Sequence, residues 1–213
     1  MIGTKVSTHN VMIHSAGTRS VGGMALIDLY RTSVRNFAAK AAAVTPVQWK
    51  DPTPCGEWDV RALVNHVVSE QRWSVPLFAG ATIAEVGDKY DGDLLGDDPV
   101  AAATEAAEDA TAAVSGSGVM ESTVHLSFGD TPAEEYVHQL LADHLIHGWD
   151  LAVGTGADRT LDPAILTEVS AWFADREEMY RSSGATGPRV ELPADASDSD
   201  RLLAAFGRDP NAW

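Results

Sequence analysis

The segment from Ala142 to Ala152 places ionisable side chains where a buried helix should carry only apolar ones. At about 100° per residue, His147 lies about 40° from Asp143 around a helix, and Asp150 about 20° to the other side. The other residues of this sector are apolar or aromatic: Tyr136, Leu140 and Leu151. The helix therefore presents a carboxylate and an imidazole side by side on a core-facing stripe.

Such groups are costly to bury without partners. A divalent metal ion would compensate them, and the spacing Asp-x-x-x-His between Asp143 and His147 is one that a metal site can use. A hydrogen-bonded Asp–His pair in the core would compensate them as well. The segment by itself leaves both interpretations open.

His66 is the third ligand that the sequence offers. It lies between Leu63 and Val67 on the inward face of another predicted helix. A single histidine on an apolar face is more often a hydrogen-bonded core residue, but Asp143 and His147 on a second core face favour a shared metal. Two histidines and one carboxylate leave a coordination position for water or substrate, as in catalytic zinc sites. We expect zinc at this site, with nickel, iron or manganese as alternatives for nitrogen and oxygen ligands.

Glu70 and Asp150 are further polar residues near the predicted site. Glu70 follows His66 by one helical turn and could orient that imidazole, act as a base or be solvated, of which we favour the last. Asp150 could support a ligand or bond to a neighbouring helix.

The remaining histidines fit the site less well. His144 lies at the edge of the sector, where it could bond to a ligand, and His138 faces almost the opposite side. The others lie in an extended segment or near the N-terminus: His125, His9 and His14.

Cys55 is the only cysteine and precedes a predicted helix, whose N-terminus could activate a thiol. No histidine is near it in sequence, and we favour a small buried residue over a nucleophile. One cysteine also excludes an internal disulfide framework and any site built from several cysteines. The chain contains no Ser/His/Asp elbow, phosphate-binding glycine loop or dinucleotide fingerprint.

Helical patterns account for most of the chain. Apolar spacing predicts helices over about 25–44, 59–78, 98–114, 131–153 and 162–180, with a short one near 200–206. We expect Asp98-Pro99, a Thr131 to Glu134 capping box and Asp162-Pro163 to begin three of them. A loop is predicted over 85–97, an extended segment over Ser122–Phe128, and a turn at Gly129-Asp130. Long helices with almost no strand predict an all-α antiparallel bundle, whose sites form between facing helices.

Net charge and hydropathy argue against several classes of partner and against a membrane-spanning protein. The 213 residues include 15 Lys and Arg against 31 Asp and Glu, a net charge of −16, which argues against nucleic acid and anionic membranes as partners. No apolar stretch is long enough to span a bilayer. We expect a cytoplasmic protein that is a monomer or homodimer. Residues 1–23 contain Lys5 and Arg19 but no acid, and we predict a flexible leader followed by one domain over 24–213.

Four motifs give the chain a resemblance to a known family. They are Thr53-Pro54-Cys55-Gly56-Glu57-Trp58, Leu63-Val64-Asn65-His66-Val67-Val68, His147-Gly148-Trp149-Asp150-Leu151-Ala152, and Asp200-Arg201-Leu202-Leu203-Ala204 with Gly207-Arg208-Asp209-Pro210. From about Leu26 onward the chain resembles the DinB-like superfamily, and within it the actinobacterial group related to the N-terminal domain of mycothiol-dependent maleylpyruvate isomerase.

The resemblance implies a four-helix bundle that binds a divalent metal through an acid, a histidine four residues later, and a histidine of the second helix. These positions match Asp143, His147 and His66, the residues that the helical pattern selects. The family acid is often glutamate, so Asp143 is a shorter variant. The isomerase also has a further C-terminal domain, for which few residues remain after the fifth predicted helix, so we do not transfer its reaction.

The resemblance favours a metal-dependent enzyme: an S-transferase or isomerase that uses a low-molecular-weight thiol, mycothiol in an actinobacterium, against an electrophilic small molecule. Its metal would lower the thiol's pKa. A hydrolase that uses metal-activated water is one alternative. A non-catalytic bundle that binds a metal or small ligand is another.

Overall fold

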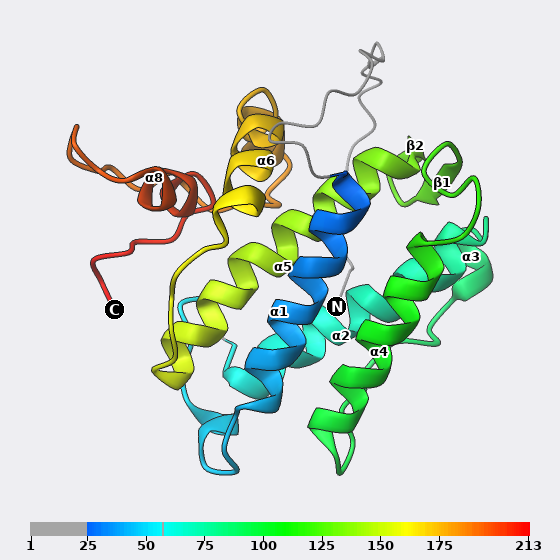
Figure 1. Ribbon diagram of the computed structural model, residues 1–213, viewed down its shortest axis with the longest axis horizontal. Helices are drawn as coiled ribbons and strands as arrows, with labels where there is room; N and C mark the ends of the chain where they lie inside the picture. The colour runs from blue at the N-terminus through cyan, green and yellow to red at the C-terminus, as the bar shows by residue number, and fades with distance from the viewer. Residues whose placement is uncertain (1–24, 57) are drawn as a thin grey trace.

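The computed structural model describes residues 25–56 and 58–213, so the predicted leader over 1–23 lies outside the described residues. Four long helices form the body of the molecule (Figure 1). They are α1 (Leu26–Ala42), α2 (Val60–Phe78), α4 (Pro99–Val114) and α5 (Ala133–Thr155). The predicted all-α bundle is therefore confirmed. The division of the chain into a leader and a single domain stays a prediction.

Small side chains bring α4 close to its neighbours. Its buried residues are alanines except for Val114, and it packs against both α1 and α2. Helix α5 packs against α1 and α2 from the other side, and nearly all of its second half is buried. His147 and Asp150 are therefore buried in the bundle, whereas Asp143, one turn before His147, is partly exposed.

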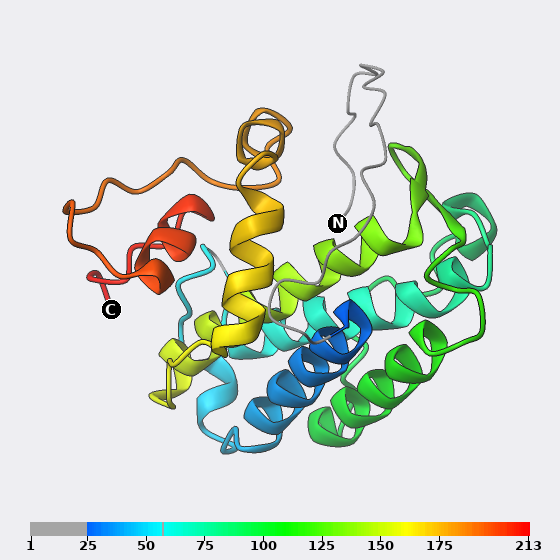
Figure 2. The ribbon, with the colours of Figure 1, turned by 45° about the horizontal axis from the view of Figure 1, so that its top comes forward.

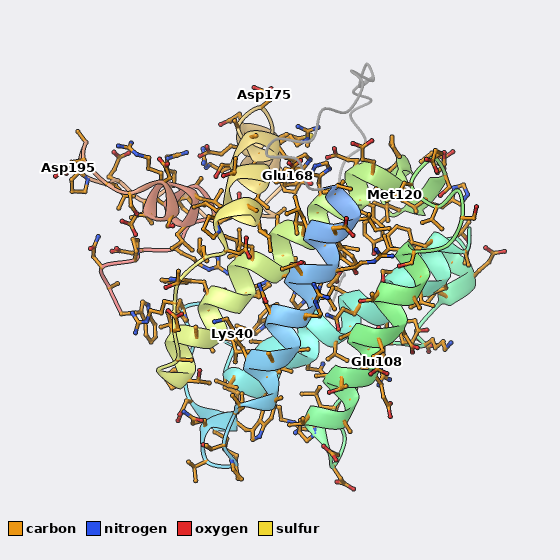
Figure 3. All side chains as sticks on the ribbon, in the orientation of Figure 1. Lys40, Glu108, Met120, Glu168, Asp175 and Asp195 are labelled. Carbon is orange, nitrogen blue, oxygen red and sulfur yellow. The ribbon has the colours of Figure 1, made fainter. Side chains whose placement is uncertain are left out.

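Shorter elements complete the fold. They are η1 (Gln48–Lys50), α3 (Ile83–Val86), α6 (Pro163–Phe173), α7 (Glu177–Ser182) and α8 (Asp198–Ala205). Figure 2 shows α6 and the C-terminal helix on one side of the bundle, away from the strands. Within the described residues, no helix is long and apolar enough to cross a membrane. The side chains of Glu108, Asp175 and Asp195 point outward (Figure 3), as expected for an acidic surface.

Two predicted helix starts are confirmed. The Asp98 carboxylate accepts from the amide of Ala101, and the Asp162 carboxylate accepts from those of Ala164 and Ile165. In both cases proline occupies the first turn, where its missing N–H has no helical partner to lose.

The predicted capping box at Thr131 is wrong. Strands β1 (Thr123–Leu126) and β2 (Gly129–Pro132) form an antiparallel hairpin in which Thr131 faces Val124. The Thr131 hydroxyl donates to the carbonyl of Gly129, and α5 begins after Pro132 without a side-chain cap. Consequently the chain turns at Ser127 and Phe128, whereas the predicted turn at Gly129-Asp130 belongs to β2.

Two other boundaries differ from the prediction. The single helix predicted from Asp162 to Tyr180 forms as two helices, because α6 ends at Phe173 and α7 begins at Glu177. Arg176 lies between them and binds Glu135 of α5, which holds this break against the bundle. The loop predicted over 85–97 begins two residues later than predicted, at Gly87, because Thr82 and Glu85 form a capping box that starts α3 and this helix continues to Val86.

Candidate metal centre

Helices α2 and α5 bring the three predicted ligands together. His66 Nε2 lies 3.4 Å from Asp143 Oδ1, and His147 Nε2 lies 3.3 Å from the same oxygen. Each of the three residues offers one possible ligand atom, and these three atoms all lie within 4.8 Å of one another. The carboxylate thus lies between two imidazoles that come from different helices.

These separations fit a shared metal ion better than hydrogen bonding. Charge-assisted N–H···O bonds are typically about 2.7–2.9 Å long. Two ligands that each lie about 2.0–2.1 Å from a tetrahedral metal are about 3.3–3.4 Å apart. The second oxygen of Asp143, Oδ2, is buried and has no hydrogen-bond partner. The donor set therefore fits a divalent cation in chemistry and in spacing.

The cluster is half-buried and has an aromatic cover. The side chains of His66 and Asp143 are each 26% exposed, whereas that of His147 is 10% exposed. The Trp58 ring lies 4.6 Å from the His66 ring and 5.7 Å from the His147 ring. The loop that carries Trp58 approaches α5 closely at Gly154, where a Cβ atom would lie 3.0 Å from the Pro52 carbonyl oxygen. Glycine at 154 thereby allows the loop to cover the site.

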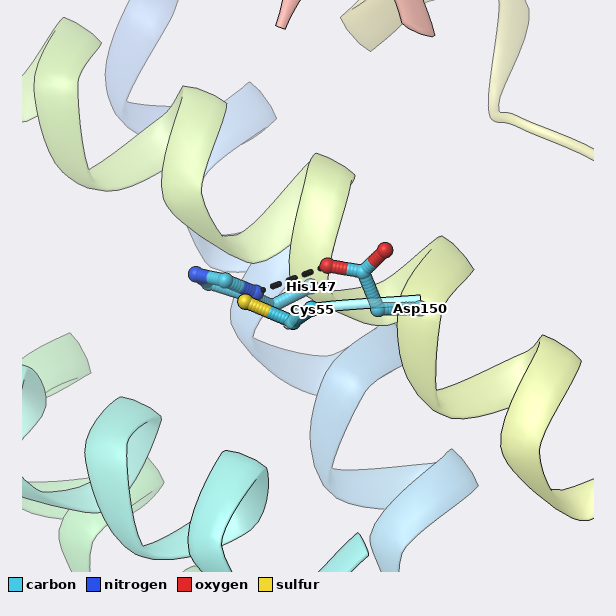
Figure 4. Close-up of side chains that lie close together, drawn as sticks. All are labelled: Cys55, His147 and Asp150. Carbon is cyan, nitrogen blue, oxygen red and sulfur yellow. Dashed lines mark hydrogen bonds and ion pairs between the residues drawn. The ribbon is translucent and has the colours of Figure 1, made fainter. Parts of the chain in front are cut away.

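A second cluster shares His147. Its other ring nitrogen, Nδ1, lies 3.0 Å from Asp150 Oδ2, and the Cys55 thiol lies beside both (Figure 4). Donor atoms of Cys55, His147 and Asp150 also meet the spacing for a metal ion. The sequence did not predict Cys55 here, because α5 brings to it a histidine that is far away in the chain.

Arg208 already supplies a positive charge to this second cluster. Its Nη2 atom lies 2.9 Å from Asp150 Oδ2 and 3.2 Å from Cys55 Sγ, and its Nε atom lies 3.0 Å from Asp150 Oδ1. A cation bound there would have to displace the guanidinium. The sequence motifs include Arg208 but do not predict its place in the site, because no local pattern links residue 208 to residue 150.

The charges of the cluster reinforce one another. Burial would raise the pKa of Asp143, but the adjacent His147 and His66 imidazoles hold it well below its usual range. Burial would lower the pKa of His147, but the Asp143 carboxylate raises it well above its usual range. Without a metal, Asp143 and His147 therefore form an ion pair, and a metal ion would have to displace the proton of His147.

A cleft of about 220 Å³ opens beside the trio of His66, Asp143 and His147. Asp143, His147 and Glu70 lie along it, and Arg208 reaches it from the C-terminal part of the chain. Aromatic and apolar side chains complete the lining, among them Tyr136, Leu140, Ile146, Trp172, Tyr180 and Phe206. The cleft is therefore mainly apolar, with its charged groups gathered near the trio.

Glu70 is not the freely solvated residue that we favoured from the sequence. It is half-buried in the cleft, and burial raises the pKa of its carboxyl group. Asp150 is fully buried and bonds both His147 and Arg208, so it supports a candidate ligand, as one of the two sequence interpretations expected.

The other described histidines lie outside the trio. His144 bonds Gln71 at 2.9 Å, and burial lowers its pKa to about 4, so it is a neutral core residue rather than a partner of a ligand. His138 bonds Glu168, and the exposed His125 bonds Asp130. His9 and His14 lie outside the described residues.

Comparisons with known proteins agree with the resemblance seen in the motifs. The family described as mycothiol maleylpyruvate isomerase N-terminal domain matches residues 30–152. Two proteins of Mycobacterium tuberculosis described as uncharacterized, from strains CDC 1551 and H37Rv, are each 33% identical over 178 residues, which is 81% of this chain and 91% of theirs. No solved structure matches the chain. The chain therefore belongs to the mycothiol maleylpyruvate isomerase N-terminal domain family.

Proposed function

We propose that this protein is a divalent-metal-dependent S-transferase or isomerase that uses a low-molecular-weight thiol to attack an electrophilic small molecule. The observation that carries the proposal is the spacing of His66, Asp143 and His147 beside a cleft. We propose these three residues as the ligands, with zinc as the expected metal. Family membership supports mycothiol as the thiol.

The trio is the better of the two clusters for such a metal. The second cluster holds the Arg208 guanidinium, whereas in the trio the two imidazoles lie beside one oxygen of Asp143 and its other oxygen is buried without a partner. Asp150 accepts from His147 Nδ1 and so turns Nε2 towards Asp143 and the cleft. A carboxylate behind a ligating histidine fixes its tautomer and orientation in many metal sites.

Three protein ligands leave a coordination position for the thiol. When bound, the metal would lower the pKa of that thiol, so that thiolate is available near neutral pH. Glu70 lines the same cleft, and its raised pKa makes its carboxylate a better proton acceptor than an exposed glutamate, so we assign it the proton that the thiol loses. The apolar and aromatic lining would bind the carbon skeleton of the electrophile.

Cobalt substitution tests the proposal, because cobalt–thiolate bonding gives a strong near-ultraviolet charge-transfer band. Addition of mycothiol at millimolar concentration to the cobalt-loaded Cys55→Ser variant should produce the band, since the only protein thiol is then absent. The band should be lost in His66→Ala and His147→Ala. The matched control is His125→Ala, which removes an exposed histidine of the hairpin and should leave the band unchanged.

The outcomes separate the competing functions. A cobalt-loaded protein that shows no band with mycothiol would contradict the thiol mechanism. Turnover of an activated ester without thiol would then favour the hydrolase, and the absence of any turnover would favour a binding protein. Equal metal content in wild type, His66→Ala and His147→Ala would contradict the ligand assignment itself.

A further inference from the structure

The C-terminal segment (residues 184–213) contacts Asp150, behind the proposed ligand His147, through the side chain of Arg208. Packing fixes the position of this residue. Phe206 stacks on Phe173 with ring centroids 4.0 Å apart, and the Arg208 amide donates to the carbonyl of Leu203. Gly207, at φ +77°, passes so close to Gly187 that a Cβ atom would lie 3.1 Å from its Cα. The guanidinium is therefore held in place by the docked segment.

The guanidinium has a buried carboxylate as its main partner. Arg208 Nε lies 3.0 and 3.2 Å from the two oxygens of Asp150, and Nη2 lies 2.9 Å from Oδ2. Asp150 is 0% exposed, so Arg208 provides the charge compensation that a buried carboxylate requires. The two residues are 58 positions apart and belong to different parts of the fold.

Asp150 also orients a proposed ligand. Its Oδ2 atom accepts from Nδ1 of His147, and this bond directs the opposite ring nitrogen towards Asp143. The same oxygen thus accepts from the C-terminal segment and from the proposed metal ligand. Loss of either contact changes the environment of the other.

We infer that Arg208 is a positioning residue that links docking of the C-terminal segment to metal binding through Asp150 and His147. The inference rests on the proposed metal ligands. Arg208 lies beyond the family match over 30–152, so the link comes from the part of this chain outside that match. The segment also forms one wall of the cleft through Ala185, Thr186 and Phe206. Because coupling between two binding events is reciprocal, metal should strengthen docking as much as docking strengthens metal binding.

Cobalt affinity of the full chain, measured from the visible absorption of Co²⁺, tests the first half of this coupling. Arg208→Met should weaken binding about 10- to 100-fold, the effect typical of residues that support a ligand. The matched control is Arg176→Met, which removes another half-buried arginine that binds a carboxylate of α5, at Glu135. It should leave the affinity unchanged.

A double-mutant cycle separates positioning from loss of fold. Asp150→Asn keeps an acceptor for His147 but loses the charge that binds Arg208. The combined variant Asp150→Asn with Arg208→Met leaves no buried charge unpaired, so it can be measured even where Arg208→Met is poorly folded. Its affinity should equal that of Asp150→Asn alone, because both changes break one connected set of contacts. Independent, additive losses would overturn the inference.

Hydrogen exchange tests the second half. Co²⁺ should slow exchange at the amides of Gly207 and Arg208, which donate to Ala204 and Leu203, in wild type but not in Asp150→Asn. Unchanged protection, or wild-type affinity in Arg208→Met, would overturn the inference and leave the metal ligands in place. If Co²⁺ affinity depends on Arg208 but mycothiol gives no charge-transfer band, the proposed thiol chemistry fails and the coupling stands. If wild type binds no Co²⁺, both proposals fail.

Discussion

Helix α5 contributes a histidine to each of two acid–histidine groups, and the two groups differ in how the imidazole is bound. In the first, Asp143 Oδ1 lies 3.3 and 3.4 Å from the nitrogens of two histidines beside an open cleft. In the second, His138 Nε2 lies 3.0 Å from Glu168 Oε1, and its Nδ1 lies 3.0 Å from the Glu134 carbonyl oxygen. Both nitrogens of His138 are thus satisfied by protein atoms.

The two groups also differ in ring packing and in how many imidazoles meet each carboxylate. The His138 ring stacks flat on Trp172, with an interplanar angle of 6°, and one carboxylate meets one imidazole. Each group leaves one buried carboxylate oxygen without a partner, so that feature does not distinguish them. The contacts of the imidazole nitrogens do distinguish the two groups. A carboxylate between two imidazoles at metal-ligand spacing fits a cation, whereas a satisfied imidazole on a tryptophan joins α5 to α6.

Metal content should separate the two groups most sharply. His66→Ala should weaken metal binding by more than about 100-fold, beyond the range expected for residues that only support a ligand. His138→Ala should retain the wild-type affinity although it removes a histidine of α5. Cobalt titration of both variants, with circular dichroism to confirm helical content, makes the measurement. A metal-poor His138→Ala variant would erase the distinction.

The pH dependence of metal binding sharpens the comparison further. Because Asp143 raises the pKa of His147, a metal must displace a proton from His147 at any pH below that raised value. Affinity should therefore fall as the pH falls, approaching about tenfold per pH unit for one displaced proton, and level off only above the raised pKa. Cobalt titrations between about pH 5.5 and 8.5 measure this slope. His138→Ala should leave it unchanged, whereas a pH-independent affinity would contradict competition by a proton.

Stability should show the opposite pattern. His138→Ala leaves Glu168 buried without its imidazole and removes the stacking on Trp172, so the free energy of unfolding should fall by about 1–3 kcal/mol. Denaturant unfolding of the metal-free protein measures the loss. His66→Ala, which removes a half-exposed side chain, should cost less in the same assay. A larger loss for His66→Ala would assign the trio a structural role.

The bundle and the trio could be predicted because both depend on helical periodicity. Apolar spacing located the long helices, and the same 100° rule placed Asp143, His147 and His66 on inward faces. The contacts of Arg208 and Cys55 could not be predicted in this way, because they join residues that are far apart in the chain. Thr131 was assigned wrongly for another reason: its capping pattern is genuine in sequence, but pairing with Val124 places it in a strand.

The smallest expected effect concerns the hydrogen bonds near the starts of the helices that carry the two groups. Asp162 accepts from two amides at the start of α6, the helix that carries Glu168 and Trp172, so Asp162→Ala should lower the free energy of unfolding by about 1 kcal/mol. Thr131→Ala, in the strand just before the helix that carries Asp143 and His147, removes only a 3.2 Å bond to the Gly129 carbonyl and should cost less. Denaturant unfolding of the two variants measures both changes. Neither should alter Co²⁺ affinity, because the trio is held by α2 and α5 rather than by α6. A cobalt affinity that falls in Asp162→Ala would show that the α6 side of the molecule supports the metal centre. The trio and the His138–Glu168 group would then not be independent of each other.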